Sequence, residues 1–182
     1  MNSPEILPDI VKHGLDAIFC EINPGLCGAT HGHHFGGTGN RFWKTMHMAG
    51  FTPVRMSPDE DARLVDYGYG LTSAVPRPSR SGDEVTATEL QLGIGDLEAK
   101  VRQWKPRVVA FLGKPAWVLY TKAAQVKWGR QALSFGNAEV WLLPNPSRFN
   151  RHYSLAELVH AYRDLRSYLG SFGVDRKGGA AP

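Results

Sequence analysis

Four short apolar runs divide the chain and predict buried β-strands. The runs are nearly continuous and do not alternate strictly between hydrophobic and polar positions. That pattern is typical of strands covered on both faces, as in a parallel sheet. The runs extend over residues 16–22, 69–75, 107–112 and 139–144.

Segments with helical signals separate these runs. The clearest covers residues 86–104, where Thr86 and Glu89 form a predicted capping box and the apolar residues make one stripe. The other predicted helices cover residues 40–50 with Asn40 as N-cap, 57–65, 114–120, and 154–169 with a box at Ser154 and Glu157. Alternating strands and helices predict an α/β fold with a mostly parallel sheet. Ligands of such sheets bind beyond the carboxyl ends of the strands, so we expect the four loops that follow the strands to converge.

The first of these loops is rich in glycine and begins with Asn23, followed by Pro-Gly. This tight turn fixes the Asn23 side chain and exposes backbone N–H groups, a geometry that could hold a small polar ligand or a water molecule. An Asx turn without a ligand is the alternative. Phe35 is the one large apolar residue between Leu26 and Phe42. It either fills the core or stacks on a flat ligand.

Three histidines of the same loop, His31, His33 and His34, raise the question of a metal site. A zinc site needs three or four ligands held by a surrounding layer of hydrogen bonds. The flanking glycines offer no such support, and no cysteine or carboxylate lies at ligand spacing nearby. We therefore expect no metal and interpret the histidines as solvated, mildly basic loop residues.

The second and third loops carry charge. Arg77, Arg80 and Asp83 lie among turn-forming residues, which is typical of a plain surface loop. The alternative is an active-site loop, with Asp83 near the chemistry and the arginines near phosphates. In the third loop Lys114 precedes a helix that starts with proline, and its free N–H groups beside a lysine could bind phosphate. The longer P-loop pattern is absent, so a nucleoside triphosphate is not expected.

The fourth loop contains a second Asn-Pro turn, at Asn145, and then an aromatic residue among cations. Phe149 follows Arg148 and precedes Arg151. An exposed aromatic flanked by cations is what insertion into a base stack requires, because the apolar wedge needs phosphate contacts on both sides. The alternative is a core phenylalanine with solvated arginines.

Composition adds limits on the class of protein. The chain has 182 residues, of which 42% are hydrophobic, and a formal net charge of +4, which suits one domain with a sizeable core and mild basicity. Its two cysteines cannot supply the four thiolates of an iron–sulfur cluster and favour a reducing compartment. No apolar run approaches the roughly 20 residues that span a bilayer, and no signal peptide is evident. We expect a soluble, cytoplasmic protein with one domain over residues 1–172 and a disordered tail over residues 173–182.

The motifs taken together resemble a known family. "INPG" before a glycine-rich loop and "NRFW", then "LVDYG", "LGK" and "LPNPS", are similar to the mismatch-specific uracil-DNA glycosylases, the bacterial relatives of thymine-DNA glycosylase. The resemblance covers about Ile18 to Leu169. It implies a three-layer α/β/α fold with a four-stranded, mostly parallel sheet. It also implies hydrolysis of the base–sugar bond of a uracil extruded from a duplex, without a metal or cofactor.

The resemblance assigns roles around an extruded base. Asn23 matches the residue that positions the attacking water, and Phe35 matches the aromatic that stacks on the base. Ile22 and the backbone of the first loop would contact the base edge, Gly25 would leave room for it, and Asn145 would donate to a base carbonyl. An amide is a weak activator, so catalysis would rest on stabilising the departing anion and aligning the water.

The remaining roles concern DNA. Phe149 occupies the position of the wedge that fills the gap in the duplex, and Ser147 belongs to the same DNA-contacting loop. Arg148 and Arg151 would flank the wedge, while Lys114 would hold a phosphate. The expected partner is double-stranded DNA with a U·G or T·G mismatch, bound by a monomer and without a membrane.

Several positions depart from the family pattern. Glu21 and Arg148 each stand where glycine is usual, so guanine recognition through the backbone at Arg148 is in question. Gly28 replaces a small serine near the ring-5 position of the base, which predicts room for a methyl group or an etheno adduct. Because Asn23 is a weak base, we expect Asp83 to assist catalysis as an ionised carboxylate.

Three functions follow from these residues. The first is a monofunctional glycosylase that removes uracil, and with it thymine or ethenocytosine, opposite guanine and so initiates base excision repair. The second is a glycosylase with general or single-strand uracil activity, which the altered wedge and Arg148 could support. The third is a protein that binds damaged bases with little turnover, which Glu21 and the weak Asn23 activator make conceivable.

Overall fold

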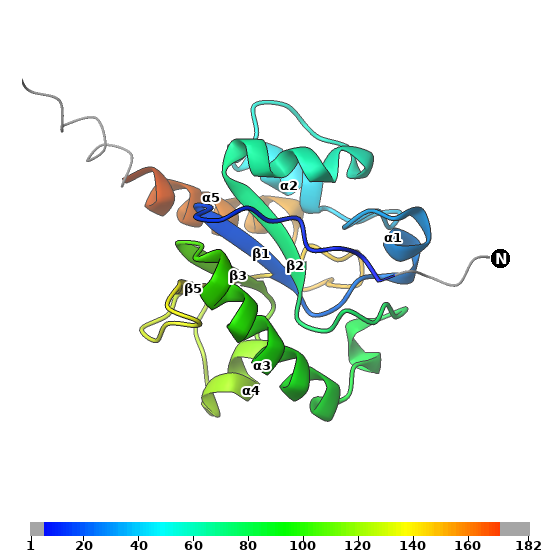
Figure 1. Cartoon of the computed structure of the whole chain (residues 1–182). Helices are drawn as coiled ribbons and strands as arrows, with labels where there is room; N and C mark the ends of the chain where they lie inside the picture. Colours follow the sequence, from blue (N-terminus) through cyan, green and yellow to red (C-terminus); the bar gives the residue numbers. More distant parts are fainter. Residues whose placement is uncertain (1–5, 172–182) are drawn as a thin grey trace, which may run out of the picture.

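Parallel strands form the centre of the molecule and lie where the apolar runs predict them (Figure 1). They are β1 (Ala17–Glu21), β2 (Tyr69–Ser73), β3 (Val108–Leu112) and β5 (Glu139–Leu143). The expected four-stranded sheet gains a fifth member, because β4 (Gly129–Arg130) pairs antiparallel with β5 and gives the order β2-β1-β3-β5-β4. The sequence gives no signal for β4, because this strand has two residues and neither belongs to an apolar run. This computed structural model describes residues 6–171, and the expected tail lies outside them.

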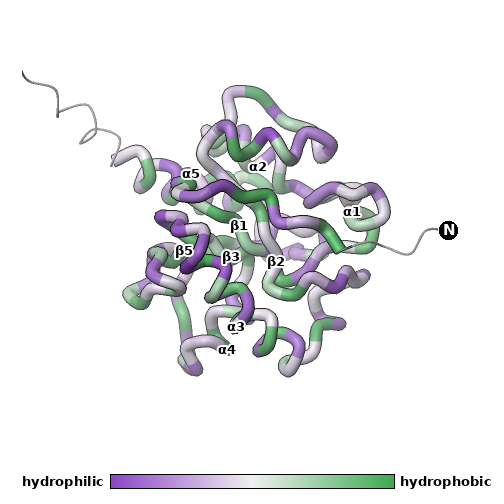
Figure 2. Tube along the Cα trace, viewed as in Figure 1, coloured by the Kyte–Doolittle hydropathy of each residue, from purple (hydrophilic) through white to green (hydrophobic). Residues whose placement is uncertain are grey.

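Helices cover both faces of the sheet, which confirms the three-layer α/β/α arrangement (Figure 1). One face packs against α2 (Phe42–Met48), the 3₁₀ helix η1 (Pro58–Tyr67) and α5 (Leu155–Ser171). The other face packs against α3 (Ala87–Trp104) and α4 (Pro115–Thr121). Hydrophobic segments gather along the central strands between these layers (Figure 2). None of the helices within residues 6–171 is long and apolar enough to cross a membrane.

The strand β1 contributes Phe19 to the centre of one of the two hydrophobic layers. Phe19 is fully buried and makes edge contacts with Phe42 and Phe51, while its ring stacks on Tyr162 at 6.2 Å between centroids. Burial of one such side chain contributes about 1.5–3 kcal/mol. The packing fixes β1 against α2 and α5, so the chain leaves the end of β1 in a defined direction toward Asn23.

A glycine sets the distance between α3 and the end of β2. A Cβ atom on Gly93 would lie 2.1 Å from the backbone oxygen of Ala74, which forbids any side chain there. The close approach fixes the start of the loop after β2, and the 3₁₀ helix η2 (Gly82–Glu84) forms in that loop.

Local elements differ from the sequence prediction in three places. The glycine-rich loop contains a helix, α1 (Leu26–His31), which ends at Gly32 in a left-handed conformation and is too short to show periodicity. The segment after Ser57 is a 3₁₀ helix rather than an α-helix, although its predicted capping box forms. Asn40 lies one residue before the N-cap of α2, yet its Oδ1 accepts a hydrogen bond from the Phe42 N–H at 2.9 Å. The side chain therefore caps the helix from one position further out.

Candidate active site

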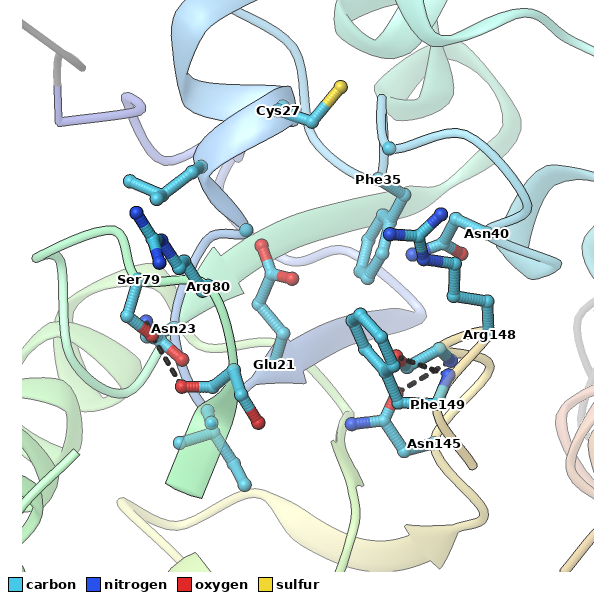
Figure 3. Close-up of a pocket in the computed structure, with 18 of the residues that line it drawn as sticks. Glu21, Asn23, Cys27, Phe35, Asn40, Ser79, Arg80, Asn145, Arg148 and Phe149 are labelled. Atoms are coloured by element: carbon cyan, nitrogen blue, oxygen red, sulfur yellow. Dashed lines mark hydrogen bonds between the residues drawn. The ribbon is translucent and has the colours of Figure 1, made fainter. Parts of the chain in front are cut away.

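A cavity of about 650 Å³ opens beyond the carboxyl ends of the strands (Figure 3). Its walls come from Leu7 and from four segments within residues 21–28, 35–40, 79–83 and 145–150. The loops after β1, β2 and β5 therefore converge as predicted. The loop after β3 contributes no residue to this wall, so the expectation that all four loops converge is wrong for that loop.

Asn23 lies at the base of one wall with only 8% of its surface exposed. Its Nδ2 donates to the Arg77 carbonyl at 3.0 Å, to the Ser79 hydroxyl at 2.7 Å and to the adjacent Pro24 carbonyl at 3.3 Å. Because carbonyl oxygens only accept, these contacts fix the orientation of the amide. The Oδ1 atom remains as the acceptor that can hold a water molecule. Ser79 was missed from the sequence, since one serine among several in a polar loop carries no signal.

Phe35 stands on the opposite wall and its ring stacks on Phe42 at 3.9 Å between centroids. Its φ of 55° lies in the left-handed region, which is uncommon for an aromatic residue. Two hydrogen bonds hold the backbone of the preceding residue: the His34 N–H donates to Asp61 Oδ2 at 2.9 Å, and Trp43 Nε1 donates to the His34 carbonyl at 3.3 Å. The ring closes the core, as the first alternative predicts, and it also faces the cavity, so stacking on a flat ligand stays a prediction.

Asn145 contributes an amide donor that makes no hydrogen bond to another residue of the described range 6–171. Its Oδ1 accepts from the Ser147 N–H at 2.8 Å in an Asx turn, and its backbone carbonyl accepts from Asn150 Nδ2 at 2.8 Å. The turn leaves the Nδ2 group of Asn145 as the donor available to the cavity (Figure 3). Ser147 also lines the cavity, and its hydroxyl accepts from the Phe149 N–H at 3.3 Å.

Phe149 is exposed to 62%, so the alternative of a core phenylalanine is wrong. Its ring lies at the cavity with the Arg148 guanidinium 4.8 Å from the ring centroid (Figure 3). Arg148 in turn packs against Gly39, where a Cβ atom would lie 3.4 Å from the arginine side chain. An exposed aromatic beside a cation at the cavity rim has the chemistry of a duplex wedge.

Arg41 fastens the loop that carries this wedge, and sequence reasoning gave it no role. Its guanidinium donates to the backbone carbonyls of four loop residues, namely Pro146, Ser147, Asn150 and Tyr153. The Arg41 N–H also donates to the Pro146 carbonyl at 3.1 Å. The "NRFW" motif thereby ties the glycine-rich loop to the second Asn-Pro loop.

Asp83 lies in η2 and lines the cavity, so the second loop is more than plain surface. Its Oδ2 accepts from the Ser81 hydroxyl at 3.3 Å, and its backbone N–H donates to the same hydroxyl. Ile22 packs near Gly82 on this wall. Arg77 turns away from the cavity and binds Glu89 at 2.7 Å, where the hydrogen bond lowers the pKa of the Glu89 carboxyl to about 2.

The two glycines assigned to the base pocket differ in their surroundings. A Cβ atom on Gly25 would meet nothing within 4 Å, so this position leaves open space. A Cβ atom on Gly28 would lie 2.7 Å from the His33 carbonyl oxygen. Gly28 lines the cavity, but the space of its absent side chain is filled by backbone. The prediction that the absent side chain of Gly28 makes room for a methyl or etheno group is therefore wrong.

Two of the predicted phosphate contacts lie away from the cavity wall. Lys114 places its ammonium 4.6 Å from the centre of the Trp128 ring. Arg151 is exposed beyond the wedge loop. Their roles toward DNA stay predictions.

The histidines are not solvated as a group, which corrects the sequence interpretation. Only 2% of the His34 surface is exposed. His33 is held by a carboxylate, since its Nδ1 lies 3.4 Å from Asp61 Oδ1. His31 remains exposed and donates to the Cys27 carbonyl. Among the residues that the structure describes, no three His, Cys, Asp or Glu side chains form a group that could hold a metal ion.

With Glu21 ionised, the two hydrogen bonds of His34 require its protonated form, because both ring nitrogens then donate. Nε2 donates to the Pro8 carbonyl at 3.0 Å and Nδ1 donates to Glu21 Oε1 at 3.1 Å. Burial alone lowers the pKa of His34, but the hydrogen bond and charge of Glu21 outweigh it and raise the pKa above its usual value. Glu21 itself lines the cavity with 11% of its side chain exposed. From the sequence, Glu21 is notable only because it stands where the family usually has glycine.

Comparison with known proteins agrees with the fold described above. The fold is similar to the solution NMR structure of a candidate uracil DNA glycosylase from Methanosarcina acetivorans, with a TM-score of 0.59 and 17% sequence identity over 88% of this chain and 96% of that one. At that identity the likeness shows the fold. The sequence profile of the uracil DNA glycosylase superfamily matches residues 8–166, which is most of the chain. The protein therefore belongs to the uracil DNA glycosylase superfamily.

Proposed function

We propose that the protein hydrolyses the base–sugar bond of uracil opposite guanine in double-stranded DNA, as a monofunctional glycosylase that starts base excision repair. Uracil is the substrate class that the superfamily implies. The observation that carries the finer proposal is one cavity that combines a water acceptor, a stacking ring, an amide donor and an exposed wedge. These are Asn23, Phe35, Asn145 and Phe149.

In this proposal the extruded base stacks on Phe35 and accepts a hydrogen bond from Asn145 Nδ2 at a carbonyl oxygen. Phe149 fills the gap left in the duplex, and Arg148 beside it contacts a phosphate. Extrusion costs a few kcal/mol and is easiest at a mismatch, which favours U·G over U·A pairs.

The chemical step is the attack of a water oxygen on C1′ of the deoxyribose. The C1′–N1 bond breaks, its electron pair leaves with the base, and the water proton is lost to solvent or to the departing base. Asn23 Oδ1 accepts a hydrogen bond from the water and aligns it without removing its proton. Asn145 stabilises the negative charge that develops on the base carbonyl. Asp83 assists as an ionised carboxylate near the electron-poor sugar.

A panel of oligonucleotides tests the proposal. The protein is incubated with U·G, U·A and T·G duplexes and with single-stranded uracil DNA, and abasic sites are then cleaved with alkali. We expect cleavage in the order U·G, then U·A, then T·G, with single-stranded DNA a poorer substrate than U·G. Equal cleavage of single-stranded DNA and U·G would favour a general uracil glycosylase. Retarded but uncut DNA would favour a binding protein.

A further inference from the structure

Glu21 places a carboxylate in the cavity, in addition to the Asn23 amide. It is the last residue of β1, two residues before Asn23, and lies between the Asn23–Ser79 wall and Phe35 (Figure 3). Its Oε1 accepts from His34 Nδ1 at 3.1 Å and from the Ser73 hydroxyl at 3.4 Å. No hydrogen bond within the described part of the chain occupies Oε2. One carboxylate oxygen is therefore held and the other is open to a ligand.

We propose that Glu21 reads the base directly, by accepting a hydrogen bond from a ring N–H at Oε2. The inference rests on the proposed glycosylase function and names the bases that this pocket admits. Uracil and thymine carry such a group at N3–H. Cytosine has a lone pair at N3 and ethenocytosine has no ring N–H, so a carboxylate there repels both.

The neighbouring groups fit this assignment. His34, which holds Glu21, directly precedes the stacking residue Phe35, so the carboxylate and the ring are fixed by one segment. Asn145 offers a donor and Glu21 an acceptor, which complements a carbonyl oxygen next to an N–H on the base. Asp83, the other carboxylate of the cavity, lies in an exposed turn, and within the described residues its side chain bonds to the Ser81 hydroxyl alone.

Charge also fits. When the glycosidic bond breaks, negative charge develops on the base, and an isolated carboxylate beside it would oppose the reaction. The imidazolium of His34 offsets the charge of Glu21, as the two donated hydrogen bonds of His34 and its raised pKa indicate. His34 is thus a positioning residue that acts through Glu21.

The test is the ratio of single-turnover cleavage of U·G duplex to that of ethenocytosine·G duplex, at enzyme concentrations below saturation. For the wild type we expect the ratio strongly to favour uracil. Glu21→Gln is nearly isosteric, and its amide can turn a donor toward the base. We expect it to lower the ratio by about 10- to 100-fold, the value of one hydrogen bond to a charged group. His34→Gln should lower the ratio in the same direction by a smaller factor.

Asp83→Asn is the matched control, because it neutralises the other carboxylate of the cavity. If Asp83 acts in the chemical step, this variant slows both substrates alike and leaves the ratio unchanged. Thermal melting of each variant shows whether it is folded, and a ratio is compared only between two substrates of the same preparation.

The outcomes separate the inference from the function on which it rests. A wild-type protein that cleaves no uracil DNA contradicts the proposed function. A wild type that cleaves U·G, with a Glu21→Gln variant whose ratio is unchanged, overturns the inference and leaves the function standing. An equal fall on both substrates also overturns it, since Glu21 would then serve the chemistry or the fold and not the base.

Discussion

Replacing Arg41 by alanine is expected to release the loop that carries the Phe149 wedge. Four backbone carbonyls accept hydrogen bonds from the Arg41 guanidinium, with distances of 2.9 Å to Ser147 and Asn150 and 3.3 Å to Pro146. At about 1 kcal/mol of net stabilisation per hydrogen bond, the loss approaches 4 kcal/mol. Arg41 is half-buried, so water replaces part of these contacts, and about 2 kcal/mol remains.

A loss of this size lowers Tm by roughly 4–8 °C in a chain of this length. The wedge loop also loses its fixed position, so we expect single-turnover cleavage of U·G duplex to fall about tenfold or more, because unstacking a base step costs a few kcal/mol that the wedge must repay. Single-stranded uracil DNA has no gap to fill and should be affected less. Arg41→Lys should be intermediate, since an ammonium has three donors and lacks the planar fork.

Arg63→Ala is the matched control for charge and size. Arg63 is 62% exposed and bonds to Glu60 within η1, away from the wedge loop, so its loss should change stability by less than about 1 kcal/mol. An Arg41→Ala variant that melts like the control and keeps full activity on the duplex would show that Arg41 does not hold the wedge loop. An equal loss of activity on duplex and single-stranded DNA would also contradict this role.

Three further variants test other parts of the site. Phe149→Ala should leave the free energy of unfolding within about 0.5 kcal/mol of wild type, because the ring is exposed. Duplex cleavage should fall while single-strand cleavage does not, and an unchanged duplex rate would contradict the wedge role. Asn145→Asp keeps the acceptor for the Ser147 N–H but loses the amide donor, so the single-turnover rate should fall about 100-fold, and a rate near wild type would contradict the donor role. The raised pKa of His34 means that the folded state binds more protons than the unfolded one. The stability that wild type gains over His34→Gln should therefore be full below about pH 6.5 and lost as the pH rises through the folded pKa; a Tm difference that grows with pH between 5 and 8 would refute the charged pair with Glu21.

The layered fold could be predicted from the sequence because apolar runs and capping boxes are local patterns. The apolar runs gave β1, β2, β3 and β5 to within a residue or two, and the capping box of Thr86 and Glu89 formed as predicted. Short elements were missed, since the six residues of α1 and the two of β4 leave no periodic pattern. These elements exist because tertiary contacts hold them, and a single sequence does not display such contacts.

The site was predicted in part. Asn23, Phe35 and Asn145 follow strand ends or lie in conspicuous loops, and the structure brings them to one cavity. The roles of Arg41 and His34 could not be predicted because their hydrogen-bond partners are distant in sequence. Arg41 binds carbonyls 105 to 112 residues away, and His34 binds Pro8 and Glu21. Histidines in a glycine-rich segment look solvated unless the buried carboxylate that pairs with one of them is known.

The central claim is that the cavity around Asn23 hydrolyses the uracil base–sugar bond with a water held by the Asn23 amide. Its most direct test is single-turnover cleavage of U·G duplex by wild type and Asn23→Ala, with DNA affinity measured in parallel. We expect cleavage by wild type and a rate lower by about 100-fold in Asn23→Ala, because the water is then misaligned. Duplex affinity should be retained, because Asn23 is buried at the base of the cavity wall. Cleavage by Asn23→Ala at the wild-type rate would contradict the central claim.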